Sequence, residues 1–148
     1  MAKRSIDTAI EIDAPAEKVW QVFSDFDSYP EWNPFVTSLT GEVAEGGKIA
    51  VRLEPPGGKA MTFKPTVKAY QPPQELRWLG KVGFSGVFDG HHQFRVESID
   101  GGKTRFHQKE DFKGILVRPM MRFIQDNTVA GFEALNRALK ERAEAKPA

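Results

Sequence analysis

The sequence predicts an α+β domain in which a curved antiparallel sheet wraps around one long C-terminal helix. Three observations favour this fold. Segments of alternating apolar and polar residues fill the middle of the chain, and turn-rich links such as "EPPGGK" and "DGGK" separate them. After residue 119 the hydrophobic period becomes helical and remains so to about residue 144. The 148 residues, 40% of them hydrophobic, suit one domain, residues 1–148, with a substantial core.

The N-terminal part is predicted to form one strand followed by two short helical pieces, the second a short helix or turn. Residues 5–11 alternate, with Ile6 and Ile10 on the same face, as in a half-buried strand. Pro15 stands where proline favours the first turn of a helix, and the run "PAEKVWQVFSDF" carries a wide apolar face. The helix is therefore expected to pack on the sheet and close one end of the domain.

The next stretch, "YPEWNPF" at residues 29–35, is unsuited to a helix interior because its two prolines remove amide donors. It is also too apolar for an ordinary solvated loop. Two interpretations stay open. Trp32 and Phe35 line a pocket while Tyr29 anchors the turn, or all three plug the gap between helix and sheet.

Six strands and a long helix are expected after this motif. The strand segments are 36–43, 48–54, 60–70, 75–83, 86–99 and 103–113. Because their links are short, consecutive strands must run antiparallel. The final helix is expected over 119–144, about 39 Å long, with Pro119 at its start and Asn127 as the polar member of its inward stripe.

The hairpin around "DGGK" brings His92 and Glu110 together. If the turn lies there, residues whose numbers sum to about 202 face each other, so His92 opposes Glu110 and Phe94 opposes Gln108. The phenylalanines of both strands share this parity, which is therefore the inward one. An imidazole beside a carboxylate on an aromatic face is either an acid–base pair or a structural pair that fixes the register. An ionised Glu110 is expected to raise the pKa of His92 above about 6.5.

Several classes of site are disfavoured. The chain has no cysteine, and 21 basic against 20 acidic residues are interleaved, so neither a thiolate site nor nucleic-acid binding is expected. His91 and His92 are neighbours on a strand and face opposite sides, while His107 lies on the outward parity, so we expect no metal site. No cofactor motif is visible. No signal peptide and no membrane insertion are expected, and the predicted location is cytoplasmic.

Four segments carry a resemblance to a known family. They are "IDAPAEKVWQVFSDFDSYPEWNPF", "FDGHHQFRVE", "TRFHQKEDFKGIL" and "GFEALNRALKERAE". In this order, and over essentially the whole chain, they resemble the START-like (SRPBCC, helix-grip) superfamily, and within it the bacterial polyketide cyclase/dehydrase-like branch. The resemblance implies a deep pocket enclosed by the sheet and the long helix. It says little about function, because the superfamily includes lipid-transfer proteins, aromatases and cyclases.

Three functions therefore stay open. The first is binding of a small hydrophobic, lipid-, aromatic- or polyketide-like molecule in the pocket. The second is a cyclase or dehydratase in which His92 and Glu110 are the catalytic acid–base pair, and the third is a protein-interaction module with a filled core. A homodimer is also left open. The expected ligand-binding residues are Trp32, Phe35, Phe63, Val67, Trp78, Phe88, Phe94, Gln108, Phe112, Met120, Ile124 and Asn127.

Overall fold

A computed structural model describes residues 3–82 and 84–145. The strands are β1 (Lys3–Ile12), β2 (Val36–Gly41), β3 (Ile49–Leu53), β4 (Met61–Phe63), β5 (Thr66–Gln71), β6 (Glu75–Lys81), β7 (Asp89–Ile99) and β8 (Lys103–Lys113). The helices are α1 (Ala16–Phe23), α2 (Tyr29–Trp32) and α3 (Val117–Glu144), with short 3-10 turns at Phe26–Ser28 and Asp100–Gly102.

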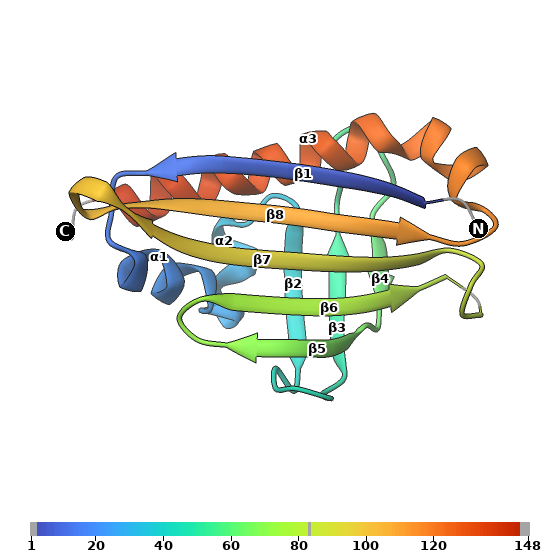
Figure 1. Ribbon diagram of the computed structural model, residues 1–148, viewed down its shortest axis with the longest axis horizontal. Helices are drawn as coiled ribbons and strands as arrows, with labels where there is room; N and C mark the ends of the chain where they lie inside the picture. Colours follow the sequence, from blue (N-terminus) through green and yellow to red (C-terminus); the bar gives the residue numbers. More distant parts are fainter. Residues whose placement is uncertain (1–2, 83, 146–148) are drawn as a thin grey trace.

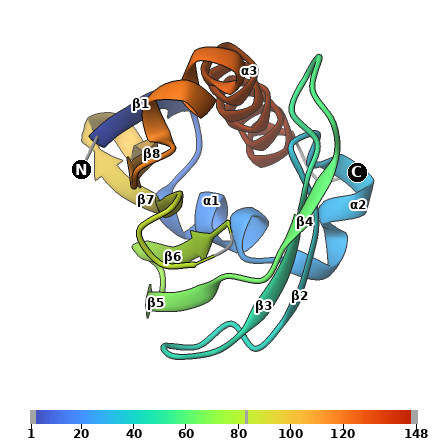
Figure 2. The same cartoon turned by 90° about the vertical axis from the view of Figure 1, so that its right-hand side faces the viewer.

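The strands form two antiparallel sheets. One has the order β1-β8-β7-β6-β5 and the other the order β2-β3-β4, and a bridge between Lys48 and Thr66 joins them. In Figure 1 the long helix α3 runs beside β1 and β8, and in the end-on view of Figure 2 the two sheets and α3 surround the interior on three sides. The predicted helix-grip arrangement, a curved antiparallel sheet around a long C-terminal helix, is confirmed.

Several element boundaries differ from the prediction by a few residues, and proline is involved in two of the differences. The expected strand 60–70 is two strands in different sheets, β4 and β5, because Pro65 between them has no amide to donate to a ladder. Helix α3 begins at Val117, two residues before Pro119. Proline is tolerated there because the first amides of a helix have no partner within the helix.

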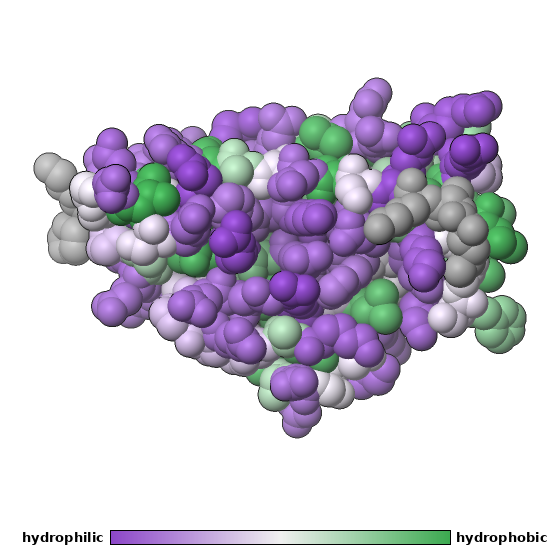
Figure 3. All heavy atoms as spheres, viewed as in Figure 1, coloured by the Kyte–Doolittle hydropathy of each residue, from purple (hydrophilic) through white to green (hydrophobic). Residues whose placement is uncertain are grey.

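The predicted hairpin register is confirmed. His92 pairs with Glu110 and Phe94 with Gln108, and Asp100–Gly102 form the turn. Along β7 the buried positions recur at every second residue from Gly90 to Val96, so this parity faces inward. The opposite face of the sheet, seen in Figure 3, is covered largely by hydrophilic side chains.

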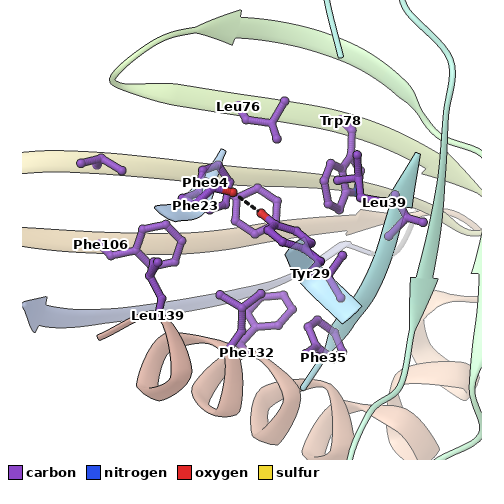
Figure 4. Close-up of a cluster of buried hydrophobic side chains, with 14 of the residues drawn as sticks. Phe23, Tyr29, Phe35, Leu39, Leu76, Trp78, Phe94, Phe106, Phe132 and Leu139 are labelled. Carbon is purple, nitrogen blue, oxygen red and sulfur yellow. Dashed lines mark hydrogen bonds between the residues drawn. The ribbon is translucent and has the colours of Figure 1, made fainter. Parts of the chain in front are cut away.

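An aromatic core fills the half of the molecule nearest α1. The ring of Phe23 lies 5.2 Å from that of Phe94 and 5.5 Å from that of Phe106. Tyr29 is buried beside them, and its hydroxyl donates a 2.5 Å hydrogen bond to the carbonyl of Phe23 (Figure 4). Tyr29 therefore anchors the turn after α1.

The described residues include no helix that is both long enough and apolar enough to cross a membrane.

Candidate functional site

A cavity of about 360 Å³ lies between the two sheets and α3. Its volume is within the range of small-molecule sites, about 300–1,000 Å³. Most of its lining is apolar. The lining residues are Phe35, Val51, Leu53, Pro55, Gly58, Lys59, Met61, Phe63, Pro65, Trp78, Gly80, Lys81, Val82, Phe88, Gly90, His92, Glu110, Phe112, Ile124, Asn127 and Thr128.

Two glycines form part of the sheet wall of this cavity. Gly80 of β6 and Gly90 of β7 are direct cross-strand partners, and both line the cavity. On these strands the inward positions on either side carry large groups, such as Trp78 and His92. A side chain at Gly80 would meet nothing closer than Pro65 at 3.8 Å, so the space in front of it is free. The missing side chain of Gly80 therefore leaves a hollow where the same sheet is otherwise filled, whereas the space in front of Gly90 holds the Glu110 carboxyl.

Nine of the fourteen predicted site residues line this cavity: Phe35, Phe63, Trp78, Phe88, His92, Glu110, Phe112, Ile124 and Asn127. They come from β4, β6, β7, β8, α3 and the segments before β2 and β7. Alternation along the strands brings them together, since side chains two apart share a face.

The other five predicted residues lie outside the cavity lining. Trp32 packs edge-on against Tyr29, with ring centroids 5.3 Å apart, and Val67 is fully buried in β5. Phe94 stacks on the ring of His92 at 4.1 Å, and Gln108 is buried in hydrogen bonds with α3. Met120 is half-buried in the first turns of α3. Alternation along the strands correctly identified the inward face of the sheet. Part of that face packs into the aromatic core and does not border the cavity.

The strongest polar feature of the cavity wall is His92 beside Glu110. The Nδ1 atom of His92 lies 3.7 Å from Oε1 of Glu110. The Glu110 side chain is 15% accessible, where it borders the cavity, and it makes no hydrogen bond to any described residue. Its Oε2 occupies the space in front of Gly90 that a Cβ would fill. Gly90 is thus required for the position of this carboxyl group.

The imidazole of His92 is held on three sides. Its ring stacks between Phe94, at 4.1 Å, and Phe132 of α3, at 4.7 Å. Its Nε2 lies 3.0 Å from Oε1 of Gln108, whose amide nitrogen in turn donates to the carbonyl of Phe132 and to Oδ1 of Asn136. Stacking and hydrogen bonding together leave the Nδ1 edge facing Glu110.

The predicted ionic pairing of His92 and Glu110 is wrong. Burial lowers the pKa of His92 to about 3, although the hydrogen bond that His92 donates to Gln108 Oε1 partly opposes this shift. Burial also raises the pKa of Glu110 to about 8, with the nearby charge of Asp111 adding to the effect. Desolvation penalises both charged forms more than their mutual attraction favours them, so both side chains are neutral at neutral pH.

Sequence reasoning missed several lining residues. Gly80 and Gly90 were not among the predicted site residues, although each lies on the inward parity of its strand. Val51 and Leu53 of β3 line the opposite wall, and Lys59 and Lys81 are exposed residues at the edge of the cavity. The approach of β3 depends on the packing of the second sheet, which no local pattern reveals.

Among the described residues no three His, Cys, Asp or Glu side chains gather as metal ligands would. Chemistry at this site would therefore draw on neutral acid, neutral imidazole and apolar surface.

Comparisons with known proteins agree with this architecture. The family model described as "Polyketide cyclase / dehydrase and lipid transport" matches residues 3–144. No curated protein matches this chain by sequence.

Similar folds occur among solved structures. The Zhui aromatase/cyclase from Streptomyces sp. R1128 is 17% identical with a TM-score of 0.71, covering 97% of this chain and 98% of that one. A START superfamily protein from Mycobacterium smegmatis is 22% identical with a TM-score of 0.69, covering 95% and 97%. Norcoclaurine synthase from Thalictrum flavum is 13% identical with a TM-score of 0.71, covering 96% and 94%. The TM-scores show a shared fold. The family match over residues 3–144 shows that the chain belongs to the polyketide cyclase / dehydrase and lipid transport family.

Proposed function

We propose that this protein binds a small hydrophobic molecule in the cavity between its two sheets and α3. The observation that carries the proposal is the cavity itself, about 360 Å³ and lined mainly by apolar side chains from both sheets and α3. Burial of apolar surface contributes roughly 25 cal/mol per Å², so such walls favour a molecule with an apolar body. The family description, which includes lipid transport, supports the same class of ligand.

The apolar and the polar residues of the cavity wall have different expected roles. Trp78, Phe88 and Phe112 offer aromatic surface from the five-stranded sheet, and Phe63 and Ile124 face them from β4 and α3. Two polar positions, Glu110 on the sheet and Asn127 on the helix, would orient the bound molecule. A few polar anchors in an apolar site commonly provide specificity in this way.

A cavity-filling variant tests this proposal. Gly80→Leu places an apolar side chain in the hollow, where the nearest atom is Pro65 Cβ at 3.8 Å, so the fold should accept it. We expect binding of the apolar fluorophore N-phenyl-1-naphthylamine, followed by its emission, to fall at least tenfold while the melting temperature stays within a few degrees. Arg95→Leu adds the same side chain on the exposed face of β7 and should leave binding unchanged. Equal binding by wild type and Gly80→Leu would contradict the proposal.

A second candidate function is a cyclase or dehydratase. It is favoured by one observation, the cavity-facing Glu110 carboxyl with His92 at 3.7 Å and no hydrogen bond to a described residue. A neutral acid beside a neutral base can donate and accept protons in a water-poor site. Glu110→Gln keeps the shape but cannot transfer a proton, so turnover of a polyketide-like substrate should collapse while its binding survives. Unchanged turnover by Glu110→Gln would exclude Glu110 as the acid.

The third alternative, an interaction module with a filled core, has less support. The described side chains leave the cavity between the sheets and α3 open, and a protein that acts through its outer surface has no need of that space.

A further inference from the structure

A line of hydrogen bonds runs from Thr8 of β1, through Asn136 of α3 and Gln108 of β8, to His92 at the cavity wall. Asn136 Nδ2 donates to Thr8 Oγ1 at 3.1 Å, and Gln108 Nε2 donates to Asn136 Oδ1 at 2.7 Å. His92 Nε2 contacts Gln108 Oε1 at 3.0 Å, and Glu110 lies next, 3.7 Å from His92 Nδ1. Asn136, Gln108 and His92 are buried, with 3%, 0% and 1% of their surface accessible, so water has little access to these bonds.

A main-chain carbonyl fixes the direction of these bonds. The amide group of Gln108 approaches the carbonyl oxygen of Phe132 at 3.0 Å, and a carbonyl can only accept. The atom of Gln108 at that position must therefore be its nitrogen, and the atom facing His92 must be its oxygen. His92 must then donate from Nε2. Because burial keeps the imidazole neutral, with a pKa of about 3, its Nδ1 carries no proton and can only accept.

The same reasoning extends to Glu110. Nδ1 of His92 and Oε1 of Glu110 are 3.7 Å apart, which is longer than a hydrogen bond. They are still close enough that an unprotonated Nδ1 facing an ionised carboxylate would set two acceptors against each other, so a protonated carboxyl that turns its O–H toward Nδ1 is favoured here. Glu110 retains that proton at neutral pH, since burial raises its pKa to about 8. With the proton on the oxygen near His92, Oε1, the other oxygen is a carbonyl-type acceptor. Every hydrogen bond in the line then points toward Thr8. With the O–H of Glu110 turned toward His92 across the 3.7 Å gap, the oxygen that borders the cavity is an acceptor.

We propose, on the basis of the proposed ligand-binding function, that the ligand is an apolar molecule carrying a neutral hydroxyl group, phenol-like in chemistry, which donates a hydrogen bond to Glu110. Gln108 and Asn136 act as positioning residues that impose this polarity through the tautomer of His92. An ether or ester of the same shape has no proton to donate, so it would leave the acceptor of Glu110 without a partner and bind less well.

Matched probes test the ligand class. At pH 6.5, binding of 2-naphthol and of 2-methoxynaphthalene is measured by calorimetry for wild type, Glu110→Gln and Glu110→Leu. The preference is the ratio of the affinity for 2-naphthol to the affinity for 2-methoxynaphthalene. This ratio should be roughly ten times larger for wild type than for Glu110→Leu, as expected for one buried hydrogen bond. Glu110→Gln should keep it, because its amide can donate to His92 and accept from the hydroxyl. Equal affinities of wild type for the two probes would overturn this inference and leave the proposed function standing. Failure of both probes to bind would count against both.

The tautomer is a second, independent test. Nitrogen-15 spectra of the His92 ring in wild type should show the proton on Nε2 and none on Nδ1, without any substitution that could disturb folding. In Gln108→Met, which removes the acceptor but keeps an unbranched side chain, the proton should no longer be confined to Nε2, and the preference for 2-naphthol should fall. Gln93→Met makes the same change on the other face of β7 and should alter neither. Wild-type His92 protonated on Nδ1 would overturn the inference.

Discussion

Glu110 and His92 face each other at the cavity wall, and both are uncharged at neutral pH. The sequence contains enough information to pair them, because turn position and alternation determine which residues oppose each other in a hairpin. It does not reveal how completely α3 and the aromatic rings of Phe94 and Phe132 would cover the imidazole. The depth of burial depends on packing between distant segments. That depth reverses the expected shift in the pKa of His92.

The two shifts predict a specific dependence of stability on pH. The pKa of Glu110 rises from 4.5 to about 8 on folding. The contribution of this shift to the free energy of unfolding is therefore complete below pH 4.5 and is lost as the pH rises toward 8. The pKa of His92 falls from 6.5 to about 3, so its contribution is complete above pH 6.5 and is lost as pH falls toward 3. From pH 6.5 to 8 only the Glu110 effect remains, and stability should decline.

Glu110→Gln should remove this alkaline decline, because an amide does not ionise. Urea unfolding at pH 6.5 and pH 8 should show a lower free energy of unfolding for wild type at the higher pH and little change for the variant. Glu133→Gln, at an exposed position of α3, should keep the wild-type decline. If Glu110→Gln declines as steeply as wild type, the carboxyl is not the group that titrates in this window.

At the scale of elements, the contact between α3 and the segment before β2 determines where the cavity begins. Gly131 of α3 faces the ring of Phe35, and a Cβ at this position would overlap the ring. Phe35 is 2% accessible, stacks near Phe132 at 5.7 Å and also lines the cavity. In the sequence, Gly131 follows Asn127 by four residues and therefore lies on the same inward stripe of the helix. Which residue it contacts depends on the path of the chain after α2, which local sequence does not determine.

Gly131→Ala should therefore destabilise the protein, although alanine is the better helix former by about 0.5–1 kcal/mol. Overpacking against a buried ring costs about 1–3 kcal/mol, so the free energy of unfolding should fall. In a Phe35→Leu background, where the smaller side chain leaves room, the same substitution should cost much less. A double-mutant cycle by urea unfolding measures this coupling, and equal costs in the two backgrounds would refute the contact explanation.

At the scale of the whole molecule, the inward surface divides into a filled part and a hollow part. Phe23, Phe94 and Phe106 fill the part nearest α1, while the absent side chain of Gly80 leaves space in the other. The order of strands and helices, and nine of the residues around the hollow, could be predicted from alternation and from the family resemblance. The boundary between core and cavity could not. It depends on how two sheets and one helix meet, which is why Phe94 and Gln108 were expected in the cavity and lie in the packed interior.

This division gives the most direct test of ligand binding, because the three tryptophans of the chain sample different parts of it. Trp78 lines the cavity, whereas Trp20 packs against Phe23 at 5.3 Å and Trp32 against Tyr29 at 5.3 Å. We would titrate nitrogen-15-labelled protein with 2-naphthol and follow the three indole N–H resonances. Binding in the cavity predicts a saturable shift of the Trp78 signal, with those of Trp20 and Trp32 nearly unmoved. An unchanged Trp78 signal at saturating probe, or equal shifts of all three, would contradict the proposal that the cavity is the binding site.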